Sequence, residues 1–397
     1  MQDKITHPLF ESGFRIFFIA AAFYAVSTMS LWSAQMSGMT DILDRIVSMP
    51  LSIWHAHELI FGVIIAIVAG FLTTAVPVWT GTPRIRGAQL IFLFLLWFAG
   101  RIAIVFSAKF PAEIVALIDL LLIPALAFTI AKPIITQKLW RNLGFIPLLL
   151  LIMIGNTLIH IEELGWGEDT AGVGIRLSIG LLILMTVVIG GRVIPFFTQN
   201  WLDRRDKKVT TATPEWIDRV TIISCLITVV ASAFPTDEFL LTTLNVLTGV
   251  LILIRLSYWQ GHHTTSDPMM WILHIGYAFM GLGFLAEALS LGTDLLPEVL
   301  AQHVFTVGGL GVMILGMMSR IALGHTGRPL IIHPLITVAY LAMILSLLSR
   351  ILTPLFLPDF YEAGLALAGI SWVVAWVLYL IIYTPILLSP RSDGKAG

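Results

Sequence analysis

Histidine is the residue type in this chain best suited to chemistry, and most of its ten copies lie in or beside long apolar runs. A neutral imidazole is a good ligand for iron, copper or zinc. Ionisable residues inside apolar runs of membrane length are costly, so they are functional candidates by default. Six histidines are therefore candidate metal ligands: His55, His57, His160, His274, His303 and His325.

The spacing of these histidines limits which of them share a metal. His55 and His57 are two residues apart, so on a regular helix they point about 200° from each other and cannot bind one metal together. Glu58 follows His55 at the spacing that puts both on one helix face. His303 and His325 are 22 residues apart, a rise of roughly 33 Å, near the full hydrocarbon thickness of a membrane. They must belong to two different sites.

Each histidine also has a simpler interpretation. A single histidine at a membrane interface often serves as an amphipathic anchor or as a hydrogen-bonded core residue. His262 and His263 lie in a loop, where we expect them to be solvated. His160 follows Asn156 by four residues, a spacing that a hydrogen-bonded core pair would explain as well as a metal site would.

Arg101, Arg192 and Arg320 lie within apolar runs and have two interpretations. A forked guanidinium binds carboxylates such as haem propionates, which makes these arginines candidate cofactor-binding residues. They could equally extend along the apolar surface to keep their charge at the interface. The sequence has no Cys-x-x-Cys-His motif, so any haem is bound non-covalently. The single cysteine, Cys225, forms no intramolecular disulfide and fits an inert packed thiol.

Membrane helices must position these residues. The chain has 57% hydrophobic and only 12% charged residues, whereas a soluble domain carries about 25% charged residues. A net charge of -1 argues against nucleic acid as a partner. Every connection is short, so we expect a single all-α integral-membrane domain over residues 1–397, in contact with membrane lipid.

Apolar runs of about 20 residues are long enough to span a bilayer. Such runs predict twelve transmembrane helices, at 14–35, 54–79, 88–108, 111–132, 143–165, 172–198, 215–235, 238–259, 268–291, 299–324, 330–354 and 361–388. The longest polar connection, 199–214, separates the first six spans from the last six.

Basic residues fall mostly on one side of this arrangement. Among lysines and arginines outside the spans, nearly all lie in the loops after even-numbered spans or at the termini, including Lys4 and Lys395, whereas the loops after odd-numbered spans hold little beyond Arg45 and Lys109. Loops after odd-numbered spans hold acidic residues instead. By the positive-inside rule, both termini and the 199–214 loop are cytoplasmic.

This orientation places four of the histidines near the outer face. Spans 2 and 10 both begin there, so we expect His55 or His57 to join His303 in an outer metal site. His160, late in span 5, is a further candidate for the same site.

The other two histidines lie near the inner face. We expect His274 and His325 to face one cavity, where they would ligate one haem iron or flank a small metal, with Arg192 and Arg320 holding the haem propionates. In the alternative interpretation, His325 only caps its helix, favoured by the negative helix C-terminus, and His274 bonds a neighbouring backbone group.

An ordered set of motifs along nearly the whole chain, except the last two spans, resembles the NnrS family. The motifs include Gly-Phe-Arg at 13–15, Trp-His-Ala-His-Glu at 54–58, Trp-Phe-Ala-Gly-Arg at 97–101, Gly-Arg-Val-Ile-Pro-Phe-Phe-Thr at 191–198, Leu-His-Ile-Gly-Tyr at 273–277, His-Val-Phe-Thr-Val-Gly at 303–308 and Gly-His-Thr-Gly-Arg at 324–328.

The resemblance implies a twelve-span protein of the bacterial inner membrane that carries haem b and copper. It also implies a role in nitric oxide metabolism, nitrosative-stress protection or denitrification, with NO or an iron–nitrosyl complex as the ligand. Two other classes stay open. One is a transporter or exporter of a metal–nitrosyl or other small molecule through a histidine-lined path. The other is a haem-based sensor or assembly factor without turnover. The sequence identifies no reaction and no electron donor.

Overall fold

The computed structural model describes residues 7–395, and every regular element in that range is helical. Twelve helical segments are long and apolar enough to cross a membrane. They match the predicted spans to within five residues at each end, which confirms the all-α, multi-span class. Lys4, which supported the predicted orientation, lies outside the described residues.

The chain forms two compact units. The first takes in the chain up to Ser178, Arg320–Ile331 and the segment from Trp376 onward, and the second takes in Ile179–Ser319 and Ile332–Ala375. Helices α9 (Thr170–Asp203), α14 (Val312–His325) and α16 (Tyr361–Leu388) have residues in both.

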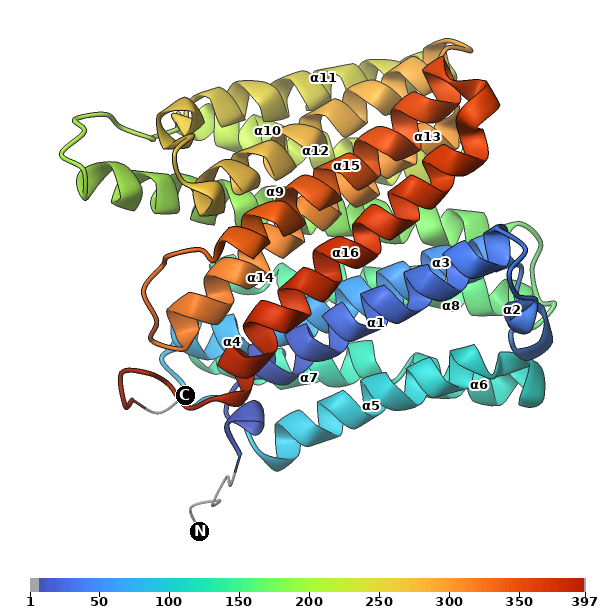
Figure 1. Cartoon of the computed structure of the whole chain (residues 1–397), viewed down its shortest axis with the longest axis horizontal. Helices are drawn as coiled ribbons and strands as arrows, with labels where there is room; N and C mark the ends of the chain where they lie inside the picture. Colours follow the sequence, from blue (N-terminus) through green and yellow to red (C-terminus); the bar gives the residue numbers. More distant parts are fainter. Residues whose placement is uncertain (1–6, 396–397) are drawn as a thin grey trace. The chain divides into compact units, whose positions relative to one another are not determined.

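Figure 1 labels the helices along the chain. The first unit contains η1 (Pro8–Phe10), α1 (Gly13–Met36), α2 (Ile42–Ile46), α3 (Leu51–His57), η2 (Glu58–Ile64), α4 (Ile65–Thr80), α5 (Ala88–Val105), η3 (Ser107–Lys109), α6 (Ala112–Asp119), α7 (Leu122–Thr136), η4 (Trp140–Asn142) and α8 (Phe145–Glu163). The second contains α10 (Glu215–Ala233), α11 (Glu238–Ser257), η5 (Gly261–Thr264), α12 (Pro268–Gly292), α13 (Glu298–His303), η6 (Val304–Gly311), α15 (Pro334–Phe356) and η7 (Pro358–Phe360).

Two neighbouring spans of the first unit are irregular. The second span runs through α3, η2 and α4, and its η2 segment is a π-helix, a wider turn that is frequent at functional sites. The fourth span is broken between α6 and α7, directly after Asp119. A wider turn and a helix break both re-aim side chains, so these positions suit a buried polar site.

Aromatic packing fixes the π-helical segment. The indole nitrogen of Trp97 donates a hydrogen bond to the carbonyl of Gly62 at 2.8 Å. A Cβ at Gly62 would lie 2.5 Å from the ring of Tyr24, so only glycine lets α1 approach here. The rings of Tyr24 and Trp97 meet edge to face, 5.7 Å apart.

Candidate metal centre

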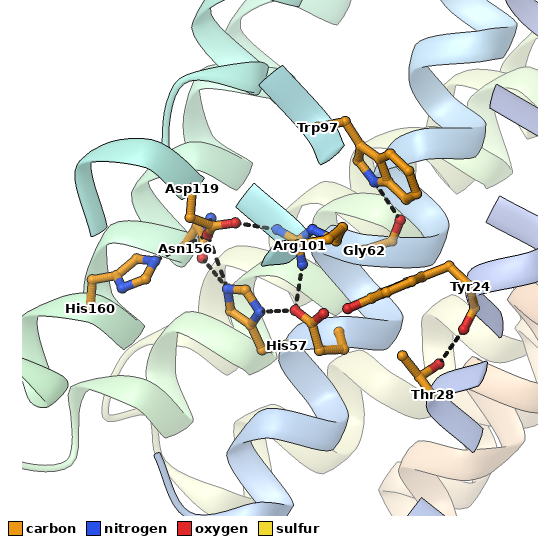
Figure 2. A network of polar contacts seen from close by, with 10 residues as sticks. Tyr24, Thr28, His57, Gly62, Trp97, Arg101, Asp119, Asn156 and His160 are labelled. Carbon is orange, nitrogen blue, oxygen red and sulfur yellow. Dashed lines mark hydrogen bonds and ion pairs between the residues drawn. The ribbon is translucent and has the colours of Figure 1, made fainter. Parts of the chain in front are cut away.

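Six polar side chains meet inside the first unit, at the two irregular spans and the helices beside them. All six are buried. They come from α3, η2, α5, α6 and α8. Figure 2 labels all of them but Glu58, and it shows the labelled ones pointing toward one another. The six are His57, Glu58, Arg101, Asp119, Asn156 and His160.

Asp119 lies at the centre of this cluster. Its Oδ2 accepts a hydrogen bond from the Asn156 amide at 2.7 Å. The same oxygen lies 3.1 Å from His57 Nε2 and 3.0 Å from His160 Nε2. Its Oδ1 accepts from Arg101. Because α6 ends at Asp119, this carboxylate extends from the end of a short helix toward α8 and the π-helix.

Arg101 joins the two carboxylates of the cluster. One terminal nitrogen donates to Glu58 Oε1 and the other to Asp119 Oδ1. A guanidinium between two acids offsets part of their mutual repulsion in a buried place. Among residues 7–395, Arg101 Nε and Glu58 Oε2 have no hydrogen-bond partner.

His57 is surrounded by oxygens that accept hydrogen bonds. Its Nδ1 lies 2.8 Å from Glu58 Oε1. Its Nε2 lies 3.1 Å from Asp119 Oδ2 and 3.0 Å from Asn156 Oδ1, while the Asn156 NH₂ group faces Asp119. A neutral imidazole has one N–H, so it satisfies the oxygen at only one ring nitrogen. A cation at the other nitrogen, either a proton or a metal ion, completes the arrangement.

The charges of the cluster support the same conclusion. With both carboxylates ionised and both histidines neutral, the cluster carries one negative charge. Buried charge is costly unless it is paired. In that state one added positive charge, a proton or a metal ion, balances the cluster.

Three of the side chains form a ligand set. His57, Asp119 and His160 each offer one ligand atom, and these atoms lie within 4.8 Å of one another. Ligands about 2 Å from a shared ion fit such separations. Two imidazoles and a carboxylate suit iron, copper or zinc. The contact of Glu58 with His57 Nδ1 is also the arrangement that usually orients a metal-binding histidine.

The structure brings together two of the predicted outer histidines, His57 and His160. His55 lies outside the cluster, and its ring stacks on Trp32 with centroids 4.4 Å apart. His303 belongs to the second unit, where its Nδ1 lies 2.6 Å from the Val299 carbonyl. Its predicted pairing with a span-2 histidine, and a ligand role for His55, stay predictions.

The predicted inner residues are divided between the two units. His274, in the second, has Nδ1 3.0 Å from the Met270 carbonyl and Nε2 3.3 Å from Thr198 Oγ1. His325, in the first, lies 5.6 Å from the Phe14 ring and ends α14. These contacts fit the simpler interpretation, in which His274 bonds a backbone group and His325 caps its helix. The other ring nitrogen of His274, Nε2, points away from the Met270 carbonyl, as an iron ligand would. The haem pairing of His274 with His325 stays a prediction.

The three predicted cofactor-binding arginines differ in their surroundings. Both terminal nitrogens of Arg101 donate hydrogen bonds to protein carboxylates. Arg192 and Arg320 are half-buried, and each has polar or electrostatic contacts. Contact of any of the three with a haem propionate stays a prediction.

Asp119 was missed by the sequence reasoning. It lies inside the predicted span 111–132, and an acid within an apolar run is the same signal that selected the histidines. Glu58 was expected to share a face with His55. The π-helix begins at Glu58, and its carboxylate meets His57 instead.

The family comparison covers almost the whole chain. Residues 8–391 match the model of the NnrS protein family. A comparison with curated proteins found no match. Membership supports a nitric oxide-related membrane protein and suggests that it binds metal, in agreement with the buried His–Asp cluster. The chain belongs to the NnrS family.

Proposed function

We propose that this protein is a copper- and haem-containing protein of the bacterial inner membrane that binds nitric oxide or an iron–nitrosyl species, with copper held by His57, Asp119 and His160. The observation that carries the proposal is the ring of acceptor oxygens around His57. Because a neutral imidazole has only one N–H, a cation beside the other ring nitrogen would stabilise the remaining oxygens. A bound copper ion would supply a coordination position for NO and a one-electron redox couple.

The protein's own residues would prepare this site. Glu58 holds His57 through Nδ1 and leaves Nε2 directed at Asp119. Arg101 holds the carboxylates of Glu58 and Asp119 in place, and the Asn156 amide fixes the second oxygen of Asp119. Such outer partners orient the ligands of a metal site before the metal binds.

The cluster suits a small ion and not a haem. The cavity beside it has a volume of about 10 Å³, room for roughly one water molecule. We therefore propose that haem b is bound elsewhere, with His274 and His325 as candidate iron ligands and Arg192 and Arg320 as candidate partners of its propionates. In support, a histidine bonded through Nδ1 to a carbonyl, as His274 is to Met270, presents Nε2 in the form that ligates iron.

The test is metal analysis and visible spectroscopy on protein purified from the membrane in mild detergent. The proposal expects copper, a haem Soret band, and a spectral change on adding NO. Replacing His57 with Ala should remove copper and spare haem, and replacing His274 or His325 with Ala should do the reverse. Protein without metal or chromophore that carries a small molecule into vesicles would overturn the proposal in favour of a transporter.

We also propose that both termini and the 199–214 loop are cytoplasmic, on the distribution of basic residues. Reporter fusions after Lys208 and at the C-terminus should both give cytoplasmic signals. A periplasmic signal at either place contradicts this orientation and the assignment of the copper cluster to the outer side.

A further inference from the structure

A small cavity adjoins the proposed copper cluster. Its volume is about 10 Å³, close to the least space that holds one water molecule, roughly 10–15 Å³. Arg101, Asp119 and Asn156 line its polar end. Arg101 Nε is a buried donor of the cluster with no partner in the part of the chain that the structure describes.

The rest of the cavity wall is apolar apart from the backbone of Gly100. It is formed by Phe61, Ile65, Leu96, Trp97, Leu122 and Ile123. Among these, Leu96 is half-buried and the others are buried. Leu96 lies on α5, between the lipid-facing side chains Phe92 and Leu95, which are 56% and 53% exposed, and Phe98. Leu96 is therefore the one apolar lining residue that also reaches the outer surface of the unit.

We infer that this cavity is the ligand pocket of the metal cluster and that it admits one small uncharged gas molecule, of the NO, CO or O₂ class, from the lipid past Leu96. The inference rests on the proposed metal centre. It specifies the class of ligand that reaches the metal and the route, from the lipid, by which that ligand enters.

Size and polarity both favour this class. The space is close to that of one water. A diatomic molecule, with one heavy atom more than water, is the ligand class nearest to it in size, whereas longer ligands exceed it. An anion would have to leave water and cross an apolar wall, which costs several kcal/mol without a partner. A neutral diatomic partitions into lipid and meets no such barrier. At the polar end, Arg101 and Asn156 line the cavity, and Arg101 Nε has no partner among the described residues.

The simpler alternative is a cavity that holds one structural water. Arg101, Asp119 and Asn156 provide the two to four polar partners that such a water needs. A structural water predicts that ligand-binding rates are indifferent to the side chain at position 96, whereas a gas pocket predicts that they follow its size.

The experiment varies this side chain and measures NO binding by stopped flow to the reduced, copper-loaded full-length protein in nanodiscs. Leu96→Trp narrows the route and should slow NO binding by about tenfold or more, because a gated site binds well below the diffusion limit. Leu96→Ala should speed it. Leu95→Trp, at the neighbouring lipid-facing position, is the matched control and should leave the rate unchanged. Wild-type protein should bind NO and exclude tert-butyl isocyanide and azide.

The outcomes separate the two proposals, because copper content is measured on the same samples. Full copper with NO rates that ignore both Leu96 variants would overturn the access route and leave the metal centre standing. Rapid binding of tert-butyl isocyanide or azide would overturn the ligand class. Copper that is absent, or that survives the loss of His57, would overturn the metal centre itself and the pocket with it.

Discussion

Replacing Asp119 with Asn removes one charge from the centre of the cluster and keeps the size of the side chain. In the native protein Asp119 has four polar neighbours: Oδ1 pairs with Arg101, and Oδ2 meets Asn156, His57 and His160. An amide has one acceptor oxygen and a donor group in place of the second. Whichever way it turns, its NH₂ faces a donor of the cluster.

Two costs follow for folding. A buried donor left without an acceptor costs about 1–3 kcal/mol. Breaking one side of a buried ion pair costs about 3–5 kcal/mol, and Glu58 still faces Arg101, which limits that loss. We therefore expect the Asn variant to be destabilised by about 3 kcal/mol.

The cost to metal binding is separate. Loss of an outer partner of a ligand lowers metal affinity by about 10–100-fold. Asp119 is itself a proposed ligand, so its loss should lower copper affinity by more than about 100-fold. Copper affinity is measured by competition titration on protein that remains folded in detergent, and stability by SDS unfolding followed by circular dichroism.

Asp41→Asn is the matched control. It makes the same change at an exposed acid that precedes the short helix α2 and pairs with Arg45 on that helix, so copper affinity and unfolding midpoint should both stay at wild-type values. Wild-type copper affinity in Asp119→Asn would show that Asp119 is no ligand. An unchanged unfolding midpoint in that variant would refute the ion-pair reasoning as well.

Three further predictions concern single side chains. Glu58→Gln keeps the hydrogen bond to the histidine beside it but weakens it, so copper affinity should fall by about 10–100-fold in the same titration, and no fall would refute its orienting role. Gly62→Ala places a Cβ 2.5 Å from the Tyr24 ring and should cost about 1–3 kcal/mol in SDS unfolding, whereas a neutral result would show that α1 yields. Arg391 lowers the pKa of Asp393, so their pairing should hold the C-terminal tail at pH values above about 4 and weaken only as the pH falls through the lowered pKa. Hydrogen exchange of the tail amides should show this acid-dependent release, with release at every pH in Asp393→Asn, and equal protection in both proteins would contradict it.

The twelve spans could be predicted from the sequence because hydropathy and length decide them. The spacing of His55 and His57 also limited them to separate environments, and the structure places one against Trp32 and the other in the cluster. Periodicity could not say which of the two faces inward, because in the regular helix α3 it fixes only the angle between them and not how the helix is turned toward its neighbours.

The cluster itself depends on contacts between distant parts of the chain. Asp119 and His57 are 62 residues apart. The predicted topology puts both residues near the same membrane face. Equal depth alone does not decide which helices are neighbours. The acid in an apolar run was a readable signal, whereas its partners follow from the packing of α5, α6 and α8 around the π-helical segment.

The central claim is that His57 and His160 bind one metal ion. Pulsed EPR on the full-length protein loaded with one equivalent of Cu(II) tests it most directly, since each bound imidazole adds the signal of its remote nitrogen. We predict two such imidazoles in the wild type and one in either His57→Ala or His160→Ala. A spectrum without imidazole coupling, or one that is the same in the wild type and both variants, would contradict the claim.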